Sequence, residues 1–189
     1  MADQLYLSYT LRNYSQENML RYYEKLLRLF PFSRLARNPS TFKVIPVDYT
    51  EPAVLEVPMP APVAIDQVLA AAQDFENADS CYRLETWWDL WQFDAEWKLT
   101  PSRTALVCSG PQFKGEEDSH LEIEFGIDAH FLPQPEVHGS LVTIQSNIKS
   151  LLKLVHDLDD ALPVETRRLW SESGENFSEK LQQALQAAS

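Results

Sequence analysis

The chain has 189 residues, of which 44% are hydrophobic and 11% aromatic, and its formal net charge is −12. This composition excludes a disordered chain, and the length fits a single domain over residues 1–189. The negative charge argues against a protein that binds nucleic acid or an anionic membrane, since phosphate contacts need clustered Lys and Arg.

Three further observations concern the compartment. The sequence has no apolar run near the roughly 18 residues that a transmembrane helix needs. Residues 1–4 lack the basic and then apolar pattern of a signal peptide. Cys81 and Cys108 are the only cysteines, and both lie in apolar segments, which predicts buried free thiols. We therefore expect a soluble cytoplasmic protein.

The N-terminal segment predicts a strand followed by a helix. Apolar and polar residues alternate over residues 5–11, which is the period of a strand with one buried face. Ser15 is a suitable N-cap, and apolar residues then recur at helical spacing over residues 16–30. Pro31 ends this predicted helix.

Residues 42–57 predict two further strands, over 42–49 and 54–57. Pro46 in the first of them indicates an edge position or a bulge. The proline-rich segment 58–62 predicts a stiff connection within the domain. A second helix is expected over residues 65–75.

The middle of the chain predicts antiparallel strands. Residues 81–93 and 97–109 form two long strands joined by a loop of hairpin length at 94–96. Pro101 predicts a bulge in the second strand. A polar, acidic loop over residues 110–118 leads to a further strand over residues 120–128.

The C-terminal third predicts helices. A helix over residues 143–162 would bury one apolar stripe, which consists of Ile144, Ile148, Leu151, Leu152, Val155, Leu158 and Leu162. A short helix that carries Leu169 and Trp170 is expected after Pro163, and a last helix from Phe177. The predicted fold is α+β: a mostly antiparallel sheet of five to six strands with helices packed on it, with a ferredoxin-like core, extra strands and a helical C-terminal third.

The segment 86–97 contains four of the five tryptophans. As a strand it directs Trp88 to the core and places Trp87, Trp91 and Phe93 on the other face among charged residues. Three interpretations of that aromatic face stay open. The C-terminal helix or the segment around Trp170 covers it, a second copy of the chain packs on it, or it binds a ligand or protein partner.

The same face offers carboxylates for acid–base chemistry. Burial of Glu85 and Asp89 among Trp87 and Trp91 would raise a carboxyl pKa and produce a general acid. The competing interpretation is that basic residues of the facing strand pair with these carboxylates as cross-strand ion pairs.

A metal-like pattern occurs at His120, Glu122 and Glu124, which share parity with Asp128 and His130. His120 and Glu124 would lie about 13 Å apart along a strand, too far to hold one ion without help from a second element. We therefore expect a solvated acidic strand face, with no metal and no cofactor.

The chain carries no nucleophile elbow, phosphate-binding glycine loop or dinucleotide fingerprint. The first functional hypothesis is a non-enzymatic protein that acts by association with itself, as a dimer, or with a protein partner. The alternative is a small-molecule binder or hydrolase-type enzyme with a carboxylate and histidine site between the sheet and the helices.

Overall fold

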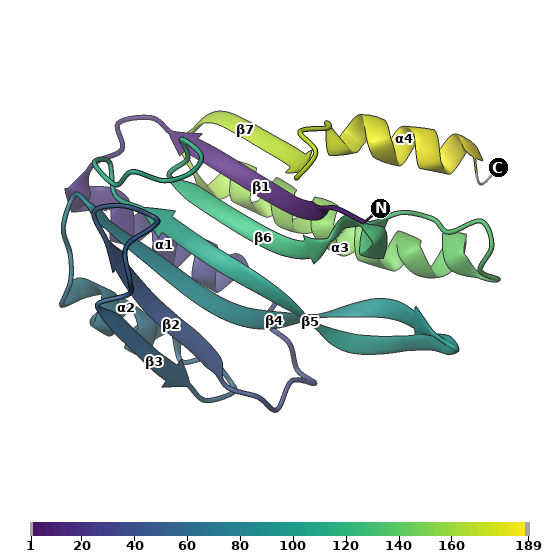
Figure 1. Cartoon of the computed structure of the whole chain (residues 1–189), viewed down its shortest axis with the longest axis horizontal. Helices are drawn as coiled ribbons and strands as arrows, with labels where there is room; N and C mark the ends of the chain where they lie inside the picture. The colour runs from purple at the N-terminus through teal and green to yellow at the C-terminus, as the bar shows by residue number, and fades with distance from the viewer. Residues whose placement is uncertain (1, 188–189) are drawn as a thin grey trace.

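The computed structural model describes residues 2–187, and its seven strands join one sheet (Figure 1). The strands are β1 (Gln4–Leu11), β2 (Ser40–Pro46), β3 (Leu55–Met59), β4 (Ser80–Asp94), β5 (Glu96–Ser109), β6 (Leu121–Ile127) and β7 (Val164–Ser171). Their order is β3-β2-β4-β5-β6-β1-β7, and every neighbouring pair is antiparallel. The α+β class is confirmed, but the expected five to six strands are too few. The ferredoxin-like core is not confirmed, because β4, β5 and β6 separate β1 from β2.

The helices are α1 (Gln16–Leu29), α2 (Ile65–Gln73), α3 (Ser140–Ala161) and α4 (Phe177–Ala187), with a 3-10 turn at Asp128–Phe131. In Figure 1, α1 and α3 lie behind the sheet, and the face toward the viewer carries no helix within the described chain. We call the face toward α1 and α3 the covered face; its strand residues include Leu5, Leu84 and Ile123, each at most 1% exposed. The opposite face, which includes Tyr6 and Arg83, is the open face.

Local sequence signals account for the first elements. The alternating apolar residues of β1 are all buried, so the predicted strand is confirmed. At the start of α1 the backbone N–H of Ser15 donates to the side-chain oxygen of Asn18 at 2.8 Å, and the helix ends before Pro31, as predicted. The ends of β2, β3 and α2 differ from the expected ones by a few residues.

The β4–β5 hairpin is the longest pairing in the sheet, and its tip projects beyond the neighbouring strands (Figure 1). Its register is unbroken from Cys81↔Ser109 to Asp94↔Glu96, so the bulge expected at Pro101 is wrong. Because β6 pairs only with the part of β5 from Ala105 onward, one edge of β5 has no partner strand at Pro101. A residue without an N–H fits such an edge.

The short helix expected after Pro163 is also wrong. Val164–Ser171 is strand β7, which pairs with the edge of β1 that does not pair with β6. Residues 165–168 are exposed and polar, so the segment lacks the alternation typical of a half-buried strand. Polar, charged side chains are typical of a strand at the edge of a sheet.

Helix α3 begins three residues earlier than expected, at Ser140. Leu151, Val155 and Leu158 are buried as predicted, but Leu152 is 52% exposed and Leu154 is buried instead. Position 152 is about 100° around the helix from Leu151, which turns it away from the stripe that meets the sheet. No helix within residues 2–187, α3 included, has the length and apolarity needed to cross a membrane.

Candidate functional site

The open face is formed by the residues that alternate with core residues on the same strands. On β4, Arg83, Glu85 and Trp87 alternate with Leu84 and Trp88, which are at most 1% exposed. The parity predicted for the tryptophan segment is therefore confirmed. The open face mixes aromatic and charged side chains in a single layer that no helix of the described chain covers.

The three aromatic residues predicted as a binding surface lie along β4 toward the hairpin tip. The guanidinium of Arg103 lies 5.7 Å from the ring centroid of Trp87, and Phe93 is 44% exposed. The side chain of Asn147 on α3 bonds the backbone N–H and C=O of Trp91, at 2.9 and 2.8 Å. The interpretation that the C-terminal helix covers these rings is wrong, because α3 packs its apolar side on the covered face. The segment around Trp170 does not cover them either, because Trp170 lies on β7 beside Tyr6, with three strands between β7 and β4.

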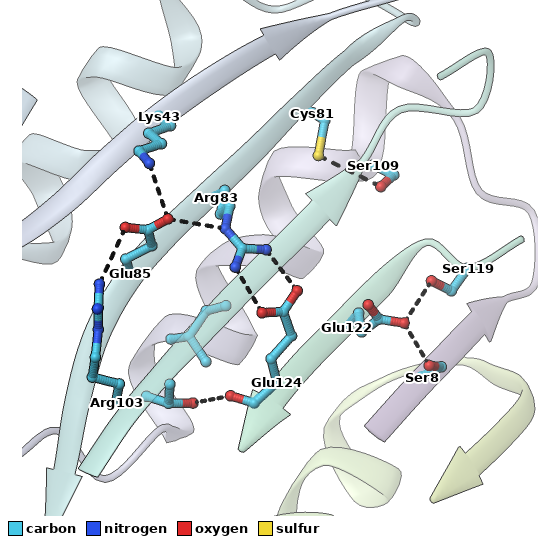
Figure 2. A network of polar contacts seen from close by, with 12 residues as sticks. Ser8, Lys43, Cys81, Arg83, Glu85, Arg103, Ser109, Ser119, Glu122 and Glu124 are labelled. Carbon is cyan, nitrogen blue, oxygen red and sulfur yellow. Dashed lines mark hydrogen bonds and ion pairs between the residues drawn. The ribbon is translucent and has the colours of Figure 1, made fainter. Parts of the chain in front are cut away.

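Glu85 is held within a network of basic side chains (Figure 2). Lys43 Nζ lies 3.0 Å and Arg83 Nε 3.3 Å from its Oε1, and Arg103 lies 3.9 Å from its Oε2. Burial raises the pKa of Glu85, but the hydrogen bonds from Lys43 and Arg83 outweigh burial, and the pKa lies below its ordinary value. A general acid needs the opposite shift.

Asp89 fixes the loop that follows α1. Its carboxylate accepts hydrogen bonds from the Ser33 hydroxyl and, at 2.9 Å, from the backbone N–H of Arg34. One oxygen therefore bonds a side chain of this loop and the other bonds its backbone. Asp89 and Glu85 lie on the same face, as predicted, but Asp89 bonds the loop after α1 whereas Glu85 pairs with basic side chains.

Arg83 is the centre of the polar network on the open face (Figure 2). Its guanidinium forms two parallel bonds of 2.6 Å to the carboxylate of Glu124 on β6, in addition to the contact with Glu85. Burial lowers the pKa of Arg83, but Glu124 and Glu85 outweigh it and raise that pKa further. The paired guanidinium therefore stays charged, and it neutralises Glu124.

The metal candidates have separate partners. His120 stacks on Tyr14 with ring centroids 4.0 Å apart, and its Nδ1 accepts the backbone N–H of Leu11 at 2.9 Å. Burial lowers the pKa of His120. Glu124 bonds Arg83, whereas Glu122 accepts the Ser8 hydroxyl at 2.7 Å. Within residues 2–187, no three His, Cys, Asp or Glu side chains come together in a way that could hold a metal ion.

The shared parity expected to extend to Asp128 and His130 does not hold. Gly126 has a φ of +82°, a left-handed conformation that ends the regular alternation of β6. Asp128 is buried, 1% exposed, and accepts bonds from Ser171 and Lys180. Asp128 thus lies where the 3-10 turn meets β7 and α4, whereas the backbone C=O of His130 accepts a bond from Asn147 on α3.

A second group on the open face was missed in the sequence. Tyr6 and Trp170, which pair across β1 and β7, stack with ring centroids 4.5 Å apart. The indole N–H of Trp170 donates to Ser8 Oγ at 3.0 Å, and Ser8 donates to Glu122. The alternation in β1 places Tyr6 and Ser8 together, but Trp170 was assigned to a helix, so its position beside them was not predicted.

Tyr6, Glu122 and Trp170 line a hollow of about 470 Å³ on the open face. Its floor is formed by β1, β4, β5, β6 and β7, and the loop before β6, including Phe113 and Ser119, forms part of its wall. Five glutamates and one arginine line it, together with four aromatic side chains. Cys81 also faces it, but burial raises the pKa of this thiol to about 11, which favours the neutral thiol over the reactive thiolate near neutral pH.

The comparisons with known proteins give no relative. No protein-family model, no curated protein and no solved structure matches the chain significantly.

Proposed function

We propose that this single α+β domain is a non-catalytic binding protein, and that its ligand lies in the hollow on the open face. The observation that carries the proposal is the combination of a sheet face without helices and a hollow of about 470 Å³ with aromatic and polar lining. Small-molecule sites have volumes of about 300–1,000 Å³ and combine apolar walls with a few polar groups.

The partners of the carboxylates support binding over catalysis. Arg83 neutralises Glu124, Lys43 pairs with Glu85, and Asp89 holds a loop, so these three carboxylates serve structural contacts. The free thiols Cys81 and Cys108 are buried, which agrees with a protein of a reducing compartment such as the cytoplasm.

The proposal is tested by filling the hollow. Val107 lines it from β5, so Val107→Trp should place a bulky ring in the ligand's space. Val142→Trp is the matched control, since Val142 is 74% exposed and lies outside this hollow. Ligand-observed NMR with a mixed library of small cations, anions and neutral compounds should detect binding to the wild type and the control, and none to Val107→Trp. Equal binding to all three proteins would refute the proposal.

A second candidate function, self-association, is supported by the hairpin tip. Phe93 and Leu99 lie on one side of the hairpin and are 44% and 42% exposed. Such exposed apolar side chains at a projecting tip are typical of association surfaces. Light scattering of the wild type and of a Phe93→Ser, Leu99→Ser variant tests it: a dimer should become a monomer, and a monomeric wild type would refute it.

A further inference from the structure

We propose that the ligand of the hollow is a small organic cation, an ammonium or guanidinium group on a short carbon chain, and that Glu122 receives its charge. This inference depends on the proposed function, because it names the chemistry of the ligand in the same hollow. Beyond the proposed function, it specifies the charge and approximate size of the ligand and the residue that binds it.

The first argument is the balance of charge. Arg83 is the only basic residue among the lining residues, and it already contacts Glu124 and Glu85. The glutamates that keep an uncompensated charge are Glu116, Glu117, Glu122 and Glu172; in the described part of the chain no Lys or Arg forms an ion pair with them. The hollow therefore attracts cations and repels phosphates and carboxylates.

The second argument is the environment of Glu122. Its partners are the hydroxyls of Ser8, at 2.7 Å, and Ser119, at 3.5 Å, and neither is charged (Figure 2). Burial raises its pKa, and so do the neighbouring charges of Glu124 and Glu117. Burying a charged carboxylate without a cationic partner raises the free energy of the protein, and a bound cation would lower it.

The third argument is the aromatic wall, which is independent of the acids. The Tyr6–Trp170 stack borders the same hollow, and an aromatic ring attracts cations through its quadrupole. The guanidinium of Arg168 lies 4.5 Å from the Trp170 centroid, so this ring already has a cation contact within the chain. Because Trp170 is already contacted by Tyr6 and Arg168, an alkyl chain on an ammonium group would pack against Tyr6.

The pKa of Tyr6 indicates that the negative charges of several glutamates are directed at one part of the hollow. Burial, and after it the charges of Glu124, Glu172, Glu122 and Glu116, together raise the pKa of Tyr6 to about 12. The Tyr6 hydroxyl therefore stays neutral at physiological pH. Of these glutamates, Glu116, Glu122 and Glu172 have no Lys or Arg partner in the described chain and would stabilise an ammonium group in that region.

An organic cation fits better than a metal ion. Metal sites need several donors within about 2–2.6 Å of one point, and within residues 2–187 no such group of His, Cys, Asp or Glu exists. Here the acids are spread around a wide hollow with aromatic walls. That arrangement fits a ligand that carries its charge on a carbon frame.

The experiment is isothermal titration calorimetry at low salt near neutral pH. Putrescine, spermidine and agmatine are the cationic probes; butanediol and succinate are the neutral and anionic probes of similar length. A short lysine-containing peptide, acetylated at its N-terminus, tests whether the ammonium group comes from a protein chain. We expect at least one free amine to bind, more weakly as salt is added, with no binding of butanediol or succinate.

The variant that decides is Glu122→Gln, which keeps the shape and the serine bonds but removes the charge. Binding of the amine should weaken roughly tenfold, the scale of one charge-assisted hydrogen bond. Glu122→Asp should retain part of the affinity. Glu96→Gln at the hairpin tip, 69% exposed and outside the hollow, is the matched control and should bind like the wild type.

The outcomes separate the two proposals. Binding of succinate or butanediol that Val107→Trp abolishes would overturn the cation inference and keep the proposed function. Amine binding that Glu122→Gln leaves unchanged would overturn the role of Glu122. Binding of the peptide without the free amines would support the cationic chemistry and overturn the small-molecule source. No binding of any probe, with no library hit, would overturn both proposals.

Discussion

The two faces of the sheet consist of alternating residues of the same strands, but different interactions stabilise them. Trp88 on the covered face is 1% exposed and packs against Phe30, Phe125 and Phe131. Trp87, its neighbour in sequence, lies on the open face beside Arg103. The covered face excludes water by packing, whereas the open face is held by ion pairs around Arg83. A sheet can thus leave one face for binding when the other carries the core.

The difference between the tryptophans gives the largest expected effect. Trp88→Ala should lower the free energy of unfolding by about 3–5 kcal/mol, because it removes a large side chain from the closed core. Trp87→Ala should cost about 1 kcal/mol. Urea unfolding followed by far-UV circular dichroism measures both. Equal losses would show that the open face is packed as tightly as the covered one.

Adjacent residues of α3 give a second comparison. Leu151→Ala should cost about 2–5 kcal/mol, since Leu151 is fully buried against the covered face. Leu152→Ala is the matched control and should change stability by less than about 0.5 kcal/mol, because Leu152 is 52% exposed. A large loss for Leu152→Ala in the same unfolding experiment would mean that another surface covers it.

Arg83 tests how much the ion pairs of the open face contribute. Arg83→Met should cost about 1–3 kcal/mol, between the values for exposed and fully buried pairs, because it leaves the partly buried carboxylate of Glu124 without its cation. Lys98→Met, which breaks the exposed pair with Glu96, should cost less than about 0.5 kcal/mol. If Arg83→Met lowered the free energy of unfolding no more than Lys98→Met does, the network would contribute nothing measurable to stability.

The smallest effect concerns pH. Folding raises the pKa of Glu122, so the folded protein binds a proton at Glu122 more tightly than the unfolded chain does. The contribution of Glu122 to the free energy of unfolding therefore falls as pH rises through the folded pKa. Glu85 has a lowered pKa, so its contribution is present above its ordinary pKa and is lost as pH falls through the folded pKa.

Glutamine variants should therefore respond in opposite directions. Relative to the wild type, Glu85→Gln should become less stable as pH rises from about 2 to about 5, and Glu122→Gln more stable as pH rises from about 4 to about 7. Urea unfolding at several pH values measures the two trends. Trends of the same sign would contradict the assignment of Glu122 as the uncompensated carboxylate and Glu85 as the paired one.

Local patterns predicted much of the fold. The alternation in β1, the N-cap at Ser15 and the stop at Pro31 are signals within a few residues, and they located β1 and α1. β7 was missed because its identity as a strand comes from its pairing with β1, about 160 residues away, and not from its own pattern. The order of the strands is likewise a property of distant contacts.

The candidate site shows the same division. Parity alone placed Arg83, Glu85 and Trp87 on one face correctly. It could not show that Glu124 pairs with Arg83 while Glu122 does not, because that depends on how β6 lies against β5 and β4. The hollow combines residues of several strands and loops that are distant in sequence, so no single stretch of sequence contained its signal.

The place of β1 between β6 and β7 determines the order in which the chain can fold. As the nascent chain grows, β1 is complete long before its flanking strands, which begin at Leu121 and Val164. The β4–β5 hairpin, with both strands adjacent in sequence, can form early, whereas β1 must wait for distant partners. Insertion of β1 is therefore a late event, and until it occurs Leu5 and Leu7 are exposed to other chains and to chaperones.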